Sequence, residues 1–165
     1  MDGDQQERTG LDERELRAWQ TFFQMQEHLH GRIEQQLQAS SGLSLADYSV
    51  LSVLSEAPGG RLRPYCLGAT LGWEKSRLHH QLTRMCRRGL VERHAGEFRA
   101  IYAQITPQGL TALEQAAPRH SRHVRRLVID RLTPGQLDQL GEISAAILGP
   151  LQHDQHDQHS GDPGE

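Results

Sequence analysis

The sequence has 165 residues, of which 36% are hydrophobic, and a formal net charge of −3, which fits one domain with polar ends. No apolar run is long enough to cross a bilayer, no charged-then-apolar leader opens the chain, and there are only two cysteines, Cys66 and Cys86. We therefore expect a soluble, cytoplasmic protein with no membrane partner and no structural disulfide.

The net charge hides an uneven distribution along the chain. Residues 1–60 contain four Lys/Arg and ten Asp/Glu, residues 61–99 contain nine and three, and residues 100–165 contain five and eight. A basic block between two acidic segments indicates one surface suited to a polyanion. The alternative is that these charges belong to ordinary solvated helix faces.

A long amphipathic helix is predicted from Asp12 to Ala39. Asp12 and Glu15 have the spacing of a capping box, and apolar residues recur at helical spacing from Leu16 to Leu37. Such a helix is roughly 40 Å long, which exceeds what one small core can cover. Its apolar stripe therefore suggests a partner chain.

Three shorter helices are expected next. Ser44 and Asp47 form a second capping-box pattern, Pro64 opens a short helix that Gly72 ends, and residues 75–88 form an amphipathic basic helix. The side of this basic helix predicted to face the core carries Leu78, Leu82, Met85 and Cys86. Trp73, just before it, is interpreted as a packing residue at the turn.

A hairpin and two more helices complete the pattern. Leu90 begins an extended segment, Ala95-Gly96 is a turn signal, and a second strand is expected from Phe98 to Ile105. Thr106-Pro107 caps a helix running to Val128 with a kink at Pro118. A last helix is predicted over residues 134–148, followed by a disordered tail.

This order of elements predicts a mainly α fold with a small β wing, namely a winged helix-turn-helix flanked by N- and C-terminal dimerisation helices. The predicted divisions are a disordered N-terminus (1–10), a dimerisation helix (11–42), a winged helix-turn-helix DNA-binding lobe (43–106), C-terminal dimerisation helices (107–150) and a disordered His/Asp/Gln-rich tail (151–165).

Four segments resemble the MarR family of bacterial transcription regulators. They are "LSLADYSVLSVLSEAPGGRLR", "LGWEKSRLHHQLTRMCRRGLVER", "ITPQGLTALEQAAP" and "LTPGQLDQL". The resemblance runs from about Arg14 to Leu148. It implies a homodimeric repressor that binds a palindromic duplex. One departure is the wing tip at residues 94–98, which is shorter than is common in the family.

The residues predicted to contact DNA lie mainly on the basic helix, because a major groove admits one α-helix whose N-terminal part reaches the bases. The candidate base readers are Ser76, Arg77, His79, His80 and Thr83, with Arg77 the foremost because a guanidinium can grip guanine at two atoms. The candidate phosphate contacts are Lys75, Arg84, Arg87, Arg88, Arg61 and Arg63. Arg99 matches the family's basic wing residue and is expected at the minor groove.

Three kinds of signal remain open for the regulator. The family resemblance implies a small aromatic ligand in a crevice between the dimer helices and the DNA-binding lobe, for which the candidate residues are Arg17, Trp19, Phe22, Phe23, His28, Tyr48 and Tyr65. The alternative is that these aromatics form the core and dimer seam. A thiol response through Cys66 or Cys86, or a metal response through the histidine pairs at His120/His123 or the tail histidines 153, 156 and 159, is less favoured.

The sequence lacks the patterns GxSxG and HExxH and any glycine loop that could cradle a phosphate, so we expect no enzyme activity, no cofactor and no built metal site. The remaining rival is a helical interaction module that acts through protein contacts without binding DNA.

Overall fold

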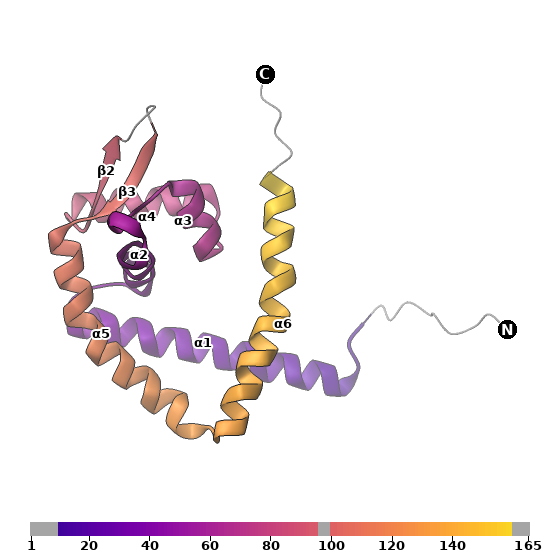
Figure 1. Cartoon of the computed structure of the whole chain (residues 1–165). Coiled ribbons are helices and arrows are strands. Elements are labelled where there is room, and N and C mark those ends of the chain that lie inside the picture. The colour runs from indigo at the N-terminus through magenta and orange to yellow at the C-terminus, as the bar shows by residue number, and fades with distance from the viewer. Residues whose placement is uncertain (1–9, 96–99, 160–165) are drawn as a thin grey trace.

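The computed structural model describes residues 10–95 and 100–159, with side chains as far as Gln152. The described chain is mostly helical with one small antiparallel sheet, as predicted (Figure 1). A helical lobe and its sheet lie at one end of a long first helix, and in this view the last helix passes in front of the part of that helix that extends beyond the lobe (Figure 1).

The first helix, α1, spans Glu13–Ser41. Both hydrogen bonds of the predicted capping box are present, because Asp12 accepts from the Glu15 amide and the Glu15 carboxylate accepts from the Asp12 amide. Gly42 ends the helix in the left-handed conformation (φ 66°) that glycine adopts without steric cost. Leu37 is the one residue of α1 that is fully buried within the described chain.

The helix-turn-helix unit consists of α2 (Leu45–Glu56), α3 (Pro64–Leu71) and α4 (Lys75–Arg87). The Ser44 capping box and the left-handed Gly72 stop are both present, as predicted. The unit surrounds a core of apolar side chains that also takes in Leu37 from α1. Its buried members are Leu37, Leu43, Val50, Leu51, Leu54, Leu67, Leu78, Leu82, Met85, Leu90, Val91, Ala103, Leu113 and Ala116.

The sheet has three strands in the order β1-β3-β2, all antiparallel: β1 (Arg61–Leu62), β2 (Val91–Ala95) and β3 (Ile101–Ile105). The hairpin was predicted, and the described part of its second strand is β3. Ala100 is outside the strand, and Phe98, where the second strand was expected to begin, lies with residues 96–99 outside the described part. The two-residue strand β1, which follows a 3-10 turn at Pro58–Gly60, was not predicted because it is too short to show a period.

A tight corner joins the lobe to α5 (Pro107–Leu127). The Thr106 hydroxyl lies 2.6 Å from the Gly89 carbonyl and 3.1 Å from the Leu90 carbonyl, and it also accepts from the Gly109 amide at 3.0 Å. A methyl group at Gly109 would overlap the Leu90 carbonyl oxygen. The "ITPQG" segment therefore needs both its threonine and its glycine to seat α5 against the lobe.

The C-terminal helices lie where they were predicted and differ from the prediction at their ends. α5 continues through Pro118 to Leu127, one residue short of the predicted end at Val128, and is followed by a 3-10 turn at Ile129–Arg131 that was not predicted. α6 spans Pro134–His159 and so extends into the tail that the sequence predicts to be disordered, since residues 151–159 contain neither glycine nor proline to stop it. Within the described residues, no helix is long and apolar enough to span a membrane.

Candidate nucleic-acid interface

The basic helix α4 presents one face to the core and the opposite face to solvent. Leu78, Leu82 and Met85 are buried, as predicted. Ser76, His80 and Arg87 are exposed and Thr83 is half-buried. These four positions differ by three or four residues in sequence, which places them in one row along an α-helix. We call this row the outer strip of α4.

Lys75 and His79 are also exposed and lie beside the outer strip, toward the hairpin. The rings of His79 and His80 meet edge to face with centroids 5.9 Å apart. Arg93 of β2 donates from Nη2 to the Thr83 hydroxyl at 3.2 Å, so the hairpin adds a cation next to the strip. The sequence analysis did not predict Arg93 as a DNA contact. It belongs to the "GLVER" segment and lies two residues after Val91, the buried residue of β2.

Arg77 and Arg84 lie on the other flank of α4. The Arg77 guanidinium sits over the Trp73 ring, 4.4 Å from its centroid, a cation–π distance. Trp73 packs against the core as predicted. Arg84 donates from Nη2 to the side-chain oxygen of Gln81. Both arginines therefore border the outer strip, and neither points straight out from the middle of it.

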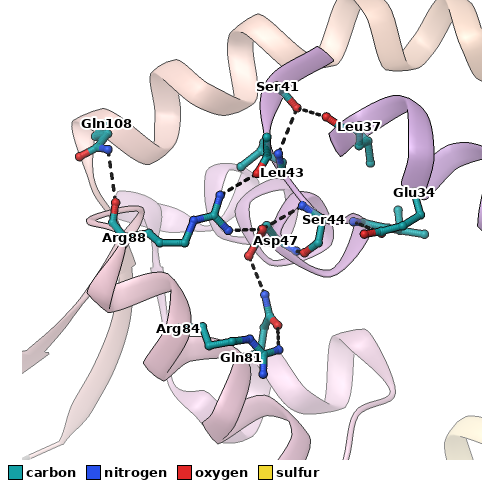
Figure 2. Close-up of polar contacts among 12 residues, drawn as sticks. Glu34, Leu37, Ser41, Leu43, Ser44, Asp47, Gln81, Arg84, Arg88 and Gln108 are labelled. Carbon is teal, nitrogen blue, oxygen red and sulfur yellow. Dashed lines mark hydrogen bonds and ion pairs between the residues drawn. The ribbon is translucent and has the colours of Figure 1, made fainter. Parts of the chain in front are cut away.

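Arg88 has a different environment from the one predicted. Its Nη1 donates to Asp47 Oδ2 at 2.5 Å and its Nη2 donates to the Gly42 carbonyl at 2.8 Å (Figure 2). Both contacts tie the end of α4 to the corner between α1 and α2. The sequence could not show this, because Arg88 and Asp47 lie far apart in the chain.

Asp47 is the centre of this polar cluster and is only 2% exposed (Figure 2). Its Oδ1 accepts from Gln81 Nε2 at 2.7 Å, and its Oδ2 also accepts from the Ser44 amide at 2.9 Å. Gln81 is likewise 2% exposed. The sequence analysis gave Asp47 a capping role, which is present, but missed Gln81. The available signal was a polar residue on the apolar face between Leu78 and Leu82.

Two further predicted cations lie on and just after β1. The guanidinium carbons of Arg61 and Arg63 are 5.2 Å and 5.8 Å from the ring centroid of Tyr102 on β3. The interaction with the Tyr102 hydroxyl raises the pKa of the exposed Arg63 above its usual value. The sheet thus holds two cations beside α3 and the hairpin. Arg99, the predicted wing contact, lies outside the described residues.

A cavity of about 500 Å³ lies between α1, the start of α2 and the inner flank of α4. Its lining is mixed, with slightly more polar than apolar surface. Its lining residues are His30, Glu34, Gln38, Ser44, Leu45, Ala46, Asp47, Ser49, Trp73, Arg77, Gln81, Arg84 and Arg88. The carboxylate of Glu34 accepts from the Leu45 amide at 2.6 Å, so it already has a backbone partner.

None of the residues predicted to bind a ligand lines this cavity. The Trp19 ring lies beside the Phe22 and Phe23 rings, with centroids 6.1 Å and 5.9 Å away, on the N-terminal half of α1. The Tyr48 ring packs on His120 with centroids 4.5 Å apart. Arg17, His28 and Tyr65 are exposed. An apolar stripe identifies a face that needs covering, but it does not distinguish a ligand cavity from a protein contact.

The other candidate signals have modest structural support. Cys66 is exposed and Cys86 is half-buried, and both are free thiols. His120 and His123 lie together on α5, where burial, followed by the neighbouring His123, lowers the pKa of His120. Across the described residues, no three His, Cys, Asp or Glu side chains lie close enough to hold a metal ion. The tail histidines at 153, 156 and 159 have no described side chains.

Comparison with solved structures identifies close relatives of this arrangement. AbsC, a MarR family transcriptional regulator from Streptomyces coelicolor, is 36% identical over 87% of this chain and 98% of its own, with a TM-score of 0.83. A second MarR family regulator from Streptomyces coelicolor, solved in complex with DNA, is 33% identical over 86% of this chain and 94% of its own, also with a TM-score of 0.83.

A more distant neighbour shares the fold alone. It is an organohalide sensing transcriptional regulator solved in a 2,4-dichlorophenol bound form, 15% identical over 88% of this chain and 89% of its own, with a TM-score of 0.75. No family model matches the sequence, and no curated protein matches it.

Proposed function

The chain belongs to the MarR family of transcriptional regulators, and from this premise we propose that it is a homodimeric repressor that binds a palindromic duplex operator and responds to a small ligand. The regulator class follows from relatives at 36% and 33% identity, one of them in complex with DNA. The dimer, the repressing action, the operator symmetry and the ligand are the proposed parts.

The observation that carries the DNA contact is the outer strip of α4. Ser76, His80, Thr83 and Arg87 form a polar row on a helix whose opposite face is anchored in the core. A B-DNA major groove about 12 Å wide admits one such helix. We propose that Ser76 and His80, nearer the N-terminus of α4, read base edges and that Arg87 contacts phosphate. Lys75, Arg61 and Arg63 supply positive charge nearby, and His79 adds an exposed polar ring.

The proposed dimer rests on apolar side chains that the single chain leaves exposed. On α1 these include Trp19 (53% exposed) and Phe23 (51%), and on α6 they include Ile143 (57%) and Leu148 (52%). Apolar faces of this length are covered in stable proteins by another chain. A two-fold pair places two α4 helices about one turn of DNA apart, which matches a palindrome.

The proposed ligand site is the cavity beside α4. It is large enough for a small organic molecule, and Arg77 and Arg84 border both the cavity and the outer strip. Occupation of the cavity would therefore act on side chains next to the DNA contact. The lining favours a polar ligand that can accept hydrogen bonds from arginine, a more polar ligand than the aromatic stripe on α1 suggested.

The DNA function is tested by selecting duplexes from a random pool and measuring their affinity by fluorescence anisotropy. The double variant Ser76→Ala/His80→Ala should lose preference for the selected duplex over a random one. Arg87→Ala should weaken binding to both duplexes equally. The matched control Arg131→Ala changes an exposed arginine remote from α4 and should bind as the parent does. If the parent protein selects no duplex from the pool, the proposal is contradicted, and the alternative of a helical module that acts through protein contacts is favoured.

The dimer and the repressing action have separate tests. Sedimentation equilibrium should give twice the chain mass for the parent, and Ile143→Asp with Leu148→Asp should shift the mass toward one chain. A reporter gene placed behind the selected duplex should fall in expression when the protein is present. A rise in reporter expression would agree with DNA binding but would contradict the proposed repression.

A further inference from the structure

We propose that Gln81 is a positioning residue for Arg84, and that the buried carboxylate of Asp47 sets the orientation of Gln81. The consequence for affinity rests on the proposed DNA-binding function, while the positioning itself can be measured without DNA. Gln81 and Asp47 would then take part in DNA recognition without touching the duplex.

The orientation of Gln81 follows from the chemistry of its partner. A carboxylate can only accept hydrogen bonds, whereas an amide has a donating nitrogen and an accepting oxygen. Gln81 Nε2 donates to Asp47 Oδ1 at 2.7 Å, which turns Gln81 Oε1 the other way, and that oxygen accepts from Arg84 Nη2 (Figure 2). Because Asp47 and Gln81 are each 2% exposed, water has little access to compete for these bonds.

Asp47 is itself fixed by groups from two other places in the chain. Its Oδ2 accepts from Arg88 and from the Ser44 amide, and Arg88 also donates to the Gly42 carbonyl. A continuous series of hydrogen bonds thus runs from the corner between α1 and α2, through the buried carboxylate, to the guanidinium of Arg84. The end of the series that reaches solvent is the arginine.

Arg87, one residue further along α4, is the natural comparison. Its side chain is exposed and makes no hydrogen bond or ion pair with the described part of the chain. A free arginine loses side-chain freedom when it binds DNA, whereas a tethered one has lost most of it beforehand. Arg84 should therefore contribute more to affinity while Gln81 is present, and Arg87 should contribute the same with or without it.

The affinity test is a pair of double-mutant cycles on the selected duplex at one fixed salt concentration. Arg84→Ala should lower affinity about tenfold in the parent and less than about twofold when Gln81→Leu is already present. Arg87→Ala should lower affinity by the same factor in both backgrounds. General damage to α4 from Gln81→Leu would change both arginines alike, so the difference between the two cycles isolates positioning.

The positioning test uses the free protein. Relaxation of the arginine side-chain ¹⁵Nε signals should show Arg84 ordered and Arg87 mobile in the parent, and Gln81→Leu should bring Arg84 to the mobility of Arg87. Gln81→Met serves as a second variant if Gln81→Leu does not fold, because methionine is unbranched and fits irregular spaces.

The possible outcomes distinguish failure of this inference from failure of the proposed DNA-binding function. If the parent binds no duplex, the proposed function fails, and the relaxation measurement alone decides whether Gln81 positions Arg84. If the parent binds and Arg84→Ala costs the same factor with and without Gln81, the inference is overturned. An Arg84 side chain as mobile as Arg87 in the parent overturns it as well.

Discussion

Replacing Asp47 with alanine should destabilise the lobe, because three interactions of its carboxylate are lost. Gln81 Nε2 loses its acceptor in a site 2% exposed, at about 1–3 kcal/mol for a buried unpaired donor. The Ser44 amide loses the carboxylate half of the capping box, at about 1 kcal/mol. Arg88 loses its ion partner, but its side chain is 43% exposed and can be hydrated, so this loss is small.

The expected total is about 2–4 kcal/mol, a large share of the roughly 5–15 kcal/mol that holds a typical domain folded. Urea unfolding followed by far-UV circular dichroism measures it, with the chain concentration held constant because association contributes to apparent stability. The control Asp138→Ala removes an exposed carboxylate from α6 and should change the free energy of unfolding by less than about 0.5 kcal/mol.

A second variant checks the cause of the loss. Adding Gln81→Leu to Asp47→Ala removes the unpaired amide and should restore part of the lost stability, because deleting both partners is milder than deleting one. Equal stability of Asp47→Ala and Asp138→Ala would refute the reasoning. The reasoning would also be refuted if the two changes were additive, that is, if the double variant were less stable than Asp47→Ala by as much as Gln81→Leu destabilises the parent.

Three other predictions concern the corner at Gly109, the pKa of His120 and the salt dependence of DNA affinity. Gly109→Ala should lower stability by more than about 3 kcal/mol or prevent folding, because its methyl would overlap the Leu90 carbonyl, while Gly135→Ala, with open space around it, should be tolerated in the same thermal-unfolding assay. The folded pKa of His120 lies below its unfolded value, so stability should fall as pH falls from about 6.5 toward the lower folded pKa, and His120→Gln should flatten that part of the urea-unfolding profile. Arg87→Ala should reduce the slope of log affinity against log salt by about one in anisotropy titrations, and an unchanged slope would remove Arg87 from the phosphate contact.

The sequence predicted the elements that depend on neighbouring residues. Capping boxes at Asp12 and Ser44, the glycine stop at Gly72 and the inward face of α4 all act over one or two helical turns, so local patterns report them. The winged helix-turn-helix followed from the order of those elements. β1 was missed because two residues have no periodicity, and it exists through its pairing with β3.

The candidate site was predictable on its outer face and not on its inner one. Exposed polar residues of α4 follow from helical spacing, which correctly placed Ser76, His80 and Arg87 opposite the core. Two partners of Asp47, Gln81 and Arg88, lie 34 and 41 residues away in the sequence, and no local pattern records such a contact. For that reason Arg88 was predicted among the phosphate contacts, and Gln81 was not predicted at all.

The corner at Thr106 and Gly109 determines where this molecule can bend. The Leu90 carbonyl, the Thr106 hydroxyl and the bare α-carbon of Gly109 leave no slack between the winged lobe and the first turn of α5. These contacts hold the lobe and the first turn of α5 in one fixed arrangement. In the proposed dimer, a change in the spacing of the two lobes would therefore bend the chain further along α5, where Pro118 removes a backbone hydrogen bond from the helix.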